Sequence, residues 1–126
     1  MSPLTYRSLE VHASYIPTGG VSGKLNIKIG RRELEWQPVV NGKRRSEVTV
    51  VTAMVDGKDR VFTHTVKELE ILVDEKHFEK QWDKPVSFYL PSSLPPDAKY
   101  VRVVVEDANN SHIGTADIPH TSLPFR

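Results

Sequence analysis

Apolar and polar residues alternate with a period of two along most of the chain, which is the pattern of half-buried β-strands. The alternation is clear over residues 9–15 and again over 24–29, where the odd-numbered positions are apolar. From Val48 to Val55 both parities are apolar or β-branched, which predicts a central strand covered at least in part on both sides. The segment from Arg60 to Val73 has mixed faces, and such a strand often carries a bulge or switches sheets.

Turn signals separate these strands. Asn41-Gly42 and Asp56-Gly57 each predict a tight hairpin. The basic cluster Lys43-Arg44-Arg45 follows the first of them, and we interpret it as part of a solvated turn. Seven or eight short strands with a turn about every ten residues indicate an all-β fold. We therefore expect an immunoglobulin-like antiparallel β-sandwich over residues 4–118, with a C-terminal tail at 119–126.

A single helix-like stretch interrupts the strand pattern near residues 75–82. Asp74 is a good N-cap for it, and Phe78 and Trp82 lie four residues apart, on one face of about two helical turns. We favour the interpretation that these two rings plug one end of the sandwich. The alternative is an exposed aromatic platform for carbohydrate, to which Tyr89 would also contribute.

The turn before the late valine strand carries the most specific local pattern. Leu94, Pro96 and Tyr100 have the spacing Leu-x-Pro-x-x-x-Tyr. This spacing is typical of a tyrosine corner, in which a ring at the start of a late strand folds back and its hydroxyl bonds nearby backbone. Trp36 is a second structural candidate, as a core tryptophan between the two sheets.

Composition excludes several kinds of functional site. The chain has 126 residues and no cysteine, so it holds neither a disulfide framework nor a thiolate site. Its net charge of +1 comes from 17 basic and 16 acidic residues, and one short basic cluster is too small for a nucleic-acid footprint. No stretch approaches the roughly 20 apolar residues of a membrane span.

Motifs for catalysis and ligand binding are also missing from the sequence. The five histidines form no HxH or HxxxH pair, and Asp56-Gly57-Lys58-Asp59 lacks the further carboxylates of a calcium loop. The adjacent Glu106 and Asp107 point to opposite faces of a strand, so they cannot act as a hydrolase pair. The sequence also has no nucleophile elbow and no phosphate-binding loop. We expect no enzyme activity, no cofactor and no metal.

Three stretches resemble the β-rich C-terminal region of acidobacterial proteins that carry a von Willebrand factor A-type domain. They are LEVHASYI, LEWQPVVNGKRRSEVTVVTAMVDGKDRVF and LPPDAKYVRVVVEDANNSHIGTADIP. Asp97 stands where that family has glycine, and the chain lacks the D-x-S-x-S metal motif of the A-type domain itself. The resemblance implies an accessory sandwich of a larger exported protein, in the periplasm or secreted. We therefore expect a non-catalytic module whose partner is a protein or an adjacent domain.

Overall fold

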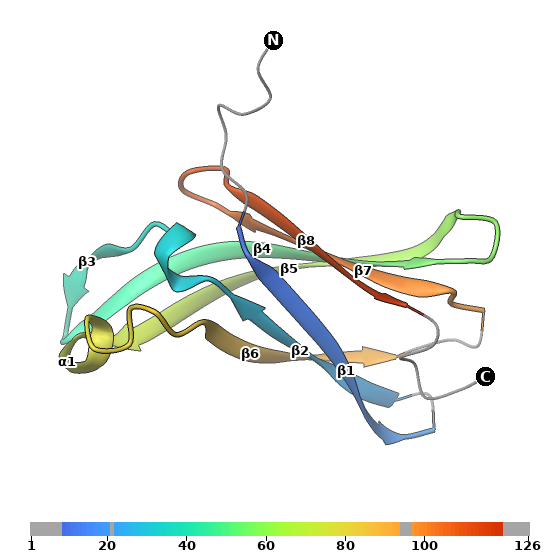
Figure 1. Ribbon diagram of the computed structural model, residues 1–126, viewed down its shortest axis with the longest axis horizontal. Coiled ribbons are helices and arrows are strands. Elements are labelled where there is room, and N and C mark those ends of the chain that lie inside the picture. The colour runs from blue at the N-terminus through green and yellow to red at the C-terminus, as the bar shows by residue number, and fades with distance from the viewer. Residues whose placement is uncertain (1–8, 21, 94–96, 120–126) are drawn as a thin grey trace, which may run out of the picture.

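The computed structural model describes residues 9–20, 22–93 and 97–119 (Figure 1). Within these residues, strands dominate and helical structure is confined to two short turns. The strands are β1 (Val11–Gly19), β2 (Ser22–Ile29), β3 (Gln37–Val40), β4 (Lys43–Val55), β5 (Val61–Asp74), β6 (Val86–Ser93), β7 (Tyr100–Asp107) and β8 (Ile113–Pro119). The helical turns are the 3-10 turn η2 (Arg31–Glu33) and α1 (Glu75–Phe78).

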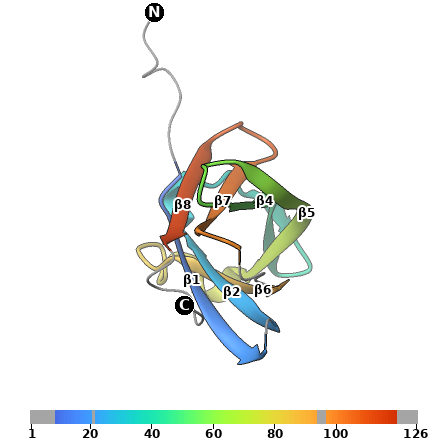
Figure 2. The ribbon, with the colours of Figure 1, turned by 90° about the vertical axis from the view of Figure 1, so that its right-hand side faces the viewer.

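The strands form two antiparallel sheets that face each other. One sheet has the order β1-β2-β6, and the other contains β8, β7, β4 and β5 in that order, with β3 as a fifth strand. β3 pairs with β4 near Lys43, whereas β7 pairs with β4 over Val48–Val55. This strand order is that of an immunoglobulin-type sandwich, so the predicted all-β sandwich is confirmed. Figure 2 shows the two sheets end-on, with β1 and β8 at one side and β5 and β6 at the other.

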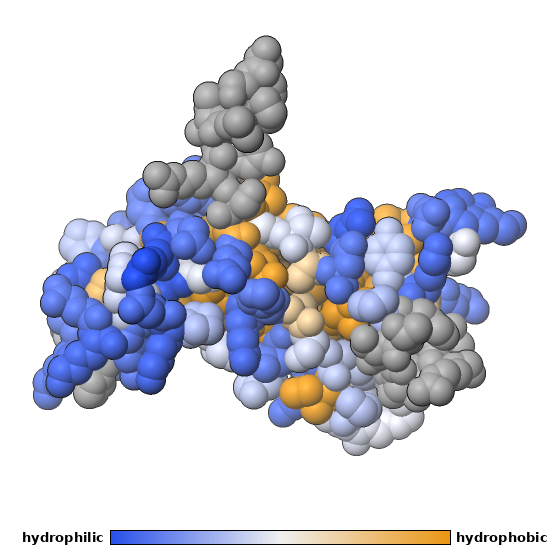
Figure 3. Space-filling view, viewed as in Figure 1, coloured by the Kyte–Doolittle hydropathy of each residue, from blue (hydrophilic) through white to orange (hydrophobic). Residues whose placement is uncertain are grey.

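The core lies between the sheets and follows from the strand alternation. Along β7, buried residues alternate with exposed or half-buried ones, as the period of two predicts. The largest fully buried apolar side chains are those of Leu25, Ile27, Ile29, Val48, Val50, Val101, Val103 and Val105. On β4 the inward Val50 is buried and the outward Val51 is half-buried, so this strand is central and covered unequally on its two faces. Hydrophilic residues cover both ends of the long axis, and hydrophobic residues show between them (Figure 3).

One side of the sandwich is closed where β1 meets β8. The backbone N–H of Leu9 donates to the Ile113 carbonyl oxygen at 2.9 Å. Gly114 lies directly behind this contact, and a Cβ at that position would overlap the Leu9 carbonyl oxygen and Cγ2 of Val11. The absence of a side chain at Gly114 therefore lets β8 approach the start of β1.

The predicted helix near residues 75–82 is only a single turn long. α1 begins after Asp74, whose carboxylate accepts a hydrogen bond from the Lys76 N–H at 3.0 Å as an N-cap does. Beyond Phe78 the chain continues in tighter turns, in which the Trp82 N–H donates to the Glu79 carbonyl oxygen at 3.2 Å. β5 ends at Asp74 and β6 begins at Val86, so α1 and these turns together reverse the chain over residues 75–85.

The hairpin at Asn41-Gly42 is confirmed, but the basic residues after it are not part of a turn. Both turn residues have positive φ, 54° and 75°, as a two-residue hairpin of this type requires. Lys43–Arg45 form the first residues of β4. The Arg44 guanidinium pairs with Glu75 at 2.8 Å, which brings the start of β4 against α1. Lys43 and Arg45 are exposed as predicted, whereas this contact leaves Arg44 half-buried.

Candidate protein-interaction edge

β5 forms an exposed edge of the larger sheet. Within the described part of the chain it pairs with β4 alone, in register from Lys43↔Asp74 to Met54↔Thr63. Every residue from Val61 to Glu68 is exposed, including the apolar Val66 at 56%. An edge strand presents unpaired N–H and C=O groups along its outer side. At 14 residues, β5 is well over twice the usual strand length of about 5–6 residues, so this edge is unusually long.

A groove opens between β5 and β6, on the side opposite the β1–β8 contact. Its volume is about 490 Å³, and it is lined by the core-facing sides of β4 and β5 and by the end of β6. Thr63 and Thr65 pair with the buried Met54 and Thr52, so they lie on the core-facing side of the sheet. They are nevertheless exposed, because β5 extends past the edge of the smaller sheet. The rest of the lining comes from His64 and Lys67 of β5 and from Leu90, Pro91, Ser92 and Ser93 of β6.

The opposite, outer face of β5 is mixed in character. His64, Val66 and Glu68 share this face, because they alternate with the core-facing Thr63, Thr65 and Lys67; His64 also borders the groove. Val66 pairs with Val51 of β4, which in turn pairs with Val104 of β7. A short apolar row therefore crosses the sheet at the level of Val66, with a histidine on one side of it and a carboxylate on the other.

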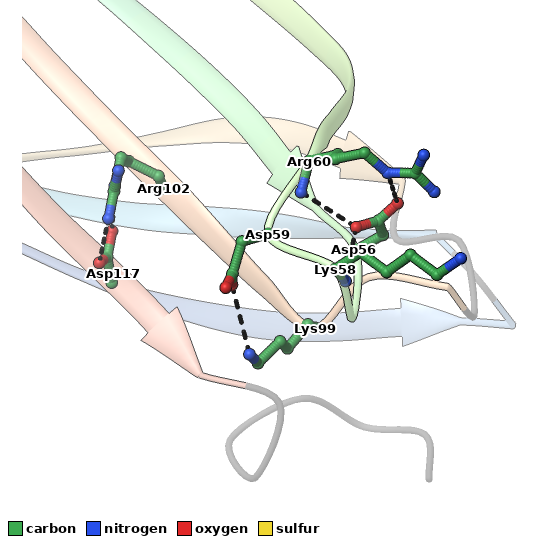
Figure 4. Close-up of polar contacts among 7 residues, drawn as sticks. All are labelled: Asp56, Lys58, Asp59, Arg60, Lys99, Arg102 and Asp117. Carbon is green, nitrogen blue, oxygen red and sulfur yellow. Dashed lines mark hydrogen bonds and ion pairs between the residues drawn. The ribbon is translucent and has the colours of Figure 1, made fainter.

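Hydrogen bonds to a carboxylate fix the hairpin at the N-terminal end of this edge (Figure 4). The Asp56 carboxylate accepts the backbone N–H groups of Lys58 at 2.8 Å and Arg60 at 3.0 Å. The N–H of Arg60 first, and then that of Lys58, hold the pKa of Asp56 below its ordinary value. Asp59 instead pairs with Lys99 of the neighbouring connection at 3.3 Å. The two carboxylates of the loop are thus engaged by different parts of the chain.

On the outer face of the same sheet, Arg102 and Asp117 join β7 to β8. Two hydrogen bonds of 2.9 and 3.0 Å link the guanidinium and the carboxylate side by side (Figure 4). Across residues 9–20, 22–93 and 97–119, no group of three or more histidine and acidic side chains is placed to hold a metal ion. Here, as at the hairpin, carboxylates pair with cations or backbone N–H groups of the chain itself.

The aromatic residues near α1 form a packed cluster. Phe78 is only 4% exposed, and its ring centroid lies 5.3 Å from that of Trp36 and 5.3 Å from that of Trp82. Trp36 is half-buried, and its indole N–H donates to the Arg31 carbonyl oxygen at 3.0 Å. The Arg44 guanidinium covers Phe78 at 4.4 Å from the ring centroid. Phe78 therefore ties α1 to the end of the sandwich.

The structure does not gather the three rings of the alternative carbohydrate platform into one cluster. Trp82 is 36% exposed and contacts Phe78, whereas Tyr89 is 54% exposed on β6 and lies under the Lys24 ammonium at 4.6 Å. Trp82 lines a separate hollow of about 440 Å³, together with His12 and neighbouring charged residues. Two exposed aromatic side chains thus lie at separate places.

The tyrosine-corner prediction falls partly outside the described residues. Tyr100 is half-buried at the first position of β7, and the Arg102 guanidinium carbon lies 5.4 Å from its ring centroid. Leu94 and Pro96 belong to the segment that the structure does not describe. The corner therefore stays a prediction.

Arg31 and Asp107 are charged residues whose burial the sequence pattern did not predict. Arg31 is held in η2, and its Nε and Nη1 have no hydrogen-bond partner among the described residues. Burial lowers the pKa of its guanidinium. Asp107 is fully buried, and its carboxylate accepts the N–H groups of Glu35 at 2.6 Å and Asn109 at 2.8 Å. The polar turn after Asp107 was the available signal, because aspartate often caps such turns. The neighbouring Glu106 is exposed, which confirms that the two carboxylates face opposite ways.

Comparison with known proteins finds no protein-family model that matches the chain and no significant match among curated proteins. Within the described residues, no helix is both long and apolar enough to cross a membrane.

Proposed function

We propose that this sandwich is a non-catalytic protein-interaction module that binds an extended polypeptide segment by strand pairing at β5. The observation that carries the proposal is the free, 14-residue edge with eight consecutive exposed residues, Val61–Glu68. An exposed edge recruits a further strand through main-chain hydrogen bonds, and side-chain pockets beside it add specificity. The groove between β5 and β6 supplies such a pocket, lined by threonine, serine, methionine, leucine and proline residues together with Lys67 and His64.

The chemistry of this surface supports binding more than catalysis. The core-facing side of β5 offers Thr63, Thr65 and Lys67, and the groove beside them is otherwise mainly apolar. An inserted strand would satisfy the free edge and cover this apolar lining, which is the usual source of affinity in strand addition. In line with the resemblance to accessory regions of exported proteins, we place the module in a larger extracytoplasmic protein. Its partner is then another protein or a neighbouring domain.

Photo-cross-linking tests this proposal in cells that express the natural protein. Benzoylphenylalanine replaces Phe62, an exposed aromatic residue on β5, or Tyr89, an exposed aromatic residue on β6. We expect a discrete cross-linked polypeptide from position 62 and none above background from position 89. Equal adducts from both positions, or none from position 62, would contradict strand pairing at β5.

A carbohydrate-binding module is the second candidate, and the exposure of Trp82 and Tyr89 favours it. Exposed rings bind sugars by stacking, so replacing each with alanine would abolish retention on the cognate polysaccharide. Affinity electrophoresis through soluble polysaccharides checks this directly. Retention of the natural protein on none of a panel of glucans, xylans and mannans would remove this candidate.

A further inference from the structure

The charge pattern of β5 identifies the partner that its edge fits. We propose that the strand that docks on β5 is β5 of a second copy of this chain, related by a twofold axis perpendicular to the sheet. This inference rests on the proposed function, because it uses the same edge and names its occupant. The product is a dimer with one continuous sheet across both copies.

A perpendicular twofold axis restricts the register to a few possibilities. It keeps the core-facing sides of both copies on the same side of the joined sheet, so residues of like parity must pair. The residue on the axis then pairs with its own copy. Centring on Lys67 or Glu68 would oppose two like charges on the axis, which is destabilising. Centring on Leu69 would oppose Glu68 to Glu70, again with like charges.

Val66 is the centre that avoids these conflicts and keeps the ladder longest. Two valines, each 56% exposed in the single chain, then meet at the axis. The paired stretch then runs from Val61 to Ile71 in each copy, with Val61 of one copy opposite Ile71 of the other. Moving the centre to Thr65 shortens the ladder and sets Val66 against His64 instead.

The flanking positions of the Val66 register are complementary. His64 faces Glu68 of the second copy on the outer face, and this contact occurs twice because of the symmetry. On the groove side, Lys67 faces Thr65, so its ammonium is not opposed by a like charge. Opposite-charge and hydrogen-bonding cross-strand pairs each stabilise a sheet, whereas like charges directly opposite destabilise it.

The structure also leaves room for this arrangement. β5 is exposed on both of its faces over Val61–Glu68, and the smaller sheet does not cover this stretch. Charged inward side chains and proline commonly block such edges. β5 contains no proline, and Lys67 is the only charged residue of the ladder on the core-facing side. In the proposed register Lys67 lies across from a threonine and remains beside the open groove.

Sedimentation equilibrium of the 126-residue chain tests the proposal, from about 1 µM to about 1 mM, the range of weak to moderate association. We expect a reversible monomer–dimer equilibrium. Val66→Glu places two carboxylates on the axis, and it should weaken the dimer about tenfold or more. The matched control is Val40→Glu, an equally drastic change at a 68%-exposed valine on β3, outside the ladder. It should leave the dimer unchanged.

A charge swap tests the register itself. His64→Glu sets two carboxylates against each other in both symmetric contacts, and it should weaken the dimer. The double variant His64→Glu with Glu68→Lys should restore it, because each contact then joins a carboxylate to an ammonium group. Within one chain the two positions are about 13 Å apart along the strand, so restoration through a direct intramolecular pair is excluded. Circular dichroism of each variant at low concentration establishes that the monomer stays folded.

The outcomes separate this inference from the proposed function. A natural chain that remains monomeric up to about 1 mM, the limit of weak association, overturns the second copy as partner. If position 62 then cross-links to a different polypeptide in cells, strand pairing at β5 still stands. Dimers that weaken equally with Val40→Glu and Val66→Glu, or that the charge swap fails to restore, also overturn the proposed register. Absence of both the dimer and the cross-link refutes both proposals.

Discussion

Replacing Phe78 with alanine should destabilise the domain more than any other aromatic substitution near α1. The ring is 4% exposed, contacts both neighbouring tryptophans at 5.3 Å and lies beneath a guanidinium. Alanine removes these contacts and leaves a cavity between α1 and the end of the sandwich. The change thus tests whether the segment after β5 is held by a plug.

The expected magnitude follows from burial and from the ring pairs. Transfer of a phenylalanine side chain out of water contributes about 1.5–3 kcal/mol. Each of the two aromatic contacts adds about 0.5–1.5 kcal/mol beyond the buried area. Partial collapse of the cavity offsets some of this loss. We therefore expect the free energy of unfolding to fall by about 3–5 kcal/mol, the range usual for buried phenylalanine.

Urea unfolding followed by tryptophan fluorescence measures this change. With a slope of about 2 kcal/mol per molar urea, the midpoint should fall by roughly 1.5–2.5 M. Phe78→Leu is the matched control, because it keeps most of the buried volume, and it should lose well under half as much. A loss below about 1 kcal/mol for Phe78→Ala, with an unchanged slope, would contradict the plug, because that is far less than a buried ring contributes.

Three further substitutions test other parts of the account. Asp107→Ala should lower the free energy of unfolding by about 1–3 kcal/mol, because it leaves two part-buried backbone N–H groups without their carboxylate acceptor, whereas Glu106→Ala should change it by less than about 0.5 kcal/mol; equal effects would refute the buried acceptor. The lowered pKa of Asp56 implies stability that is present above the ordinary pKa of aspartate and lost as pH falls through the lowered value. The advantage of the natural chain over Asp56→Asn should therefore shrink in urea titrations from neutral pH to about pH 3, and a constant difference would contradict this. Gly114→Ala should destabilise by about 1–3 kcal/mol through overlap with β1, while Gly57→Ala, with open space around it, should be near neutral in thermal unfolding.

Strand periodicity predicted the sandwich because alternation is a local property of the chain. The central position of β4 followed from its two apolar faces, and the Asn41-Gly42 hairpin followed from residues that tolerate positive φ. The parity of β5 likewise separated Thr63 and Thr65 from Val66. The parity of a strand does not reveal which other strand is its neighbour in the sheet, since strand pairing joins segments that are far apart in the sequence.

The interaction edge and the buried charges therefore required the structure. Threonines on the core-facing side of a strand are compatible with a strand that the opposite sheet covers in part and with one that it leaves exposed. The three-stranded opposite sheet does not reach β5, so these threonines are exposed. The basic residues beside Arg44 in the sequence likewise suggest a solvated side chain. In the structure, however, its guanidinium covers Phe78 at 4.4 Å and pairs with Glu75. The helix near residues 75–82 was predicted too long. Its N-cap and apolar spacing were evident in the sequence, whereas the tighter turns that follow Phe78 were not.

Amide hydrogen exchange tests the central claim, that β5 is the docking edge, most directly. Exchange is compared between the free chain at low concentration and the complex that cross-linking at Phe62 captures. We predict new protection within Val61–Ile71 on complex formation, with the amides of β6 around Tyr89 unchanged. Protection that appears around Trp82 and Tyr89 instead, with β5 exchanging as fast as in the free chain, would contradict the account.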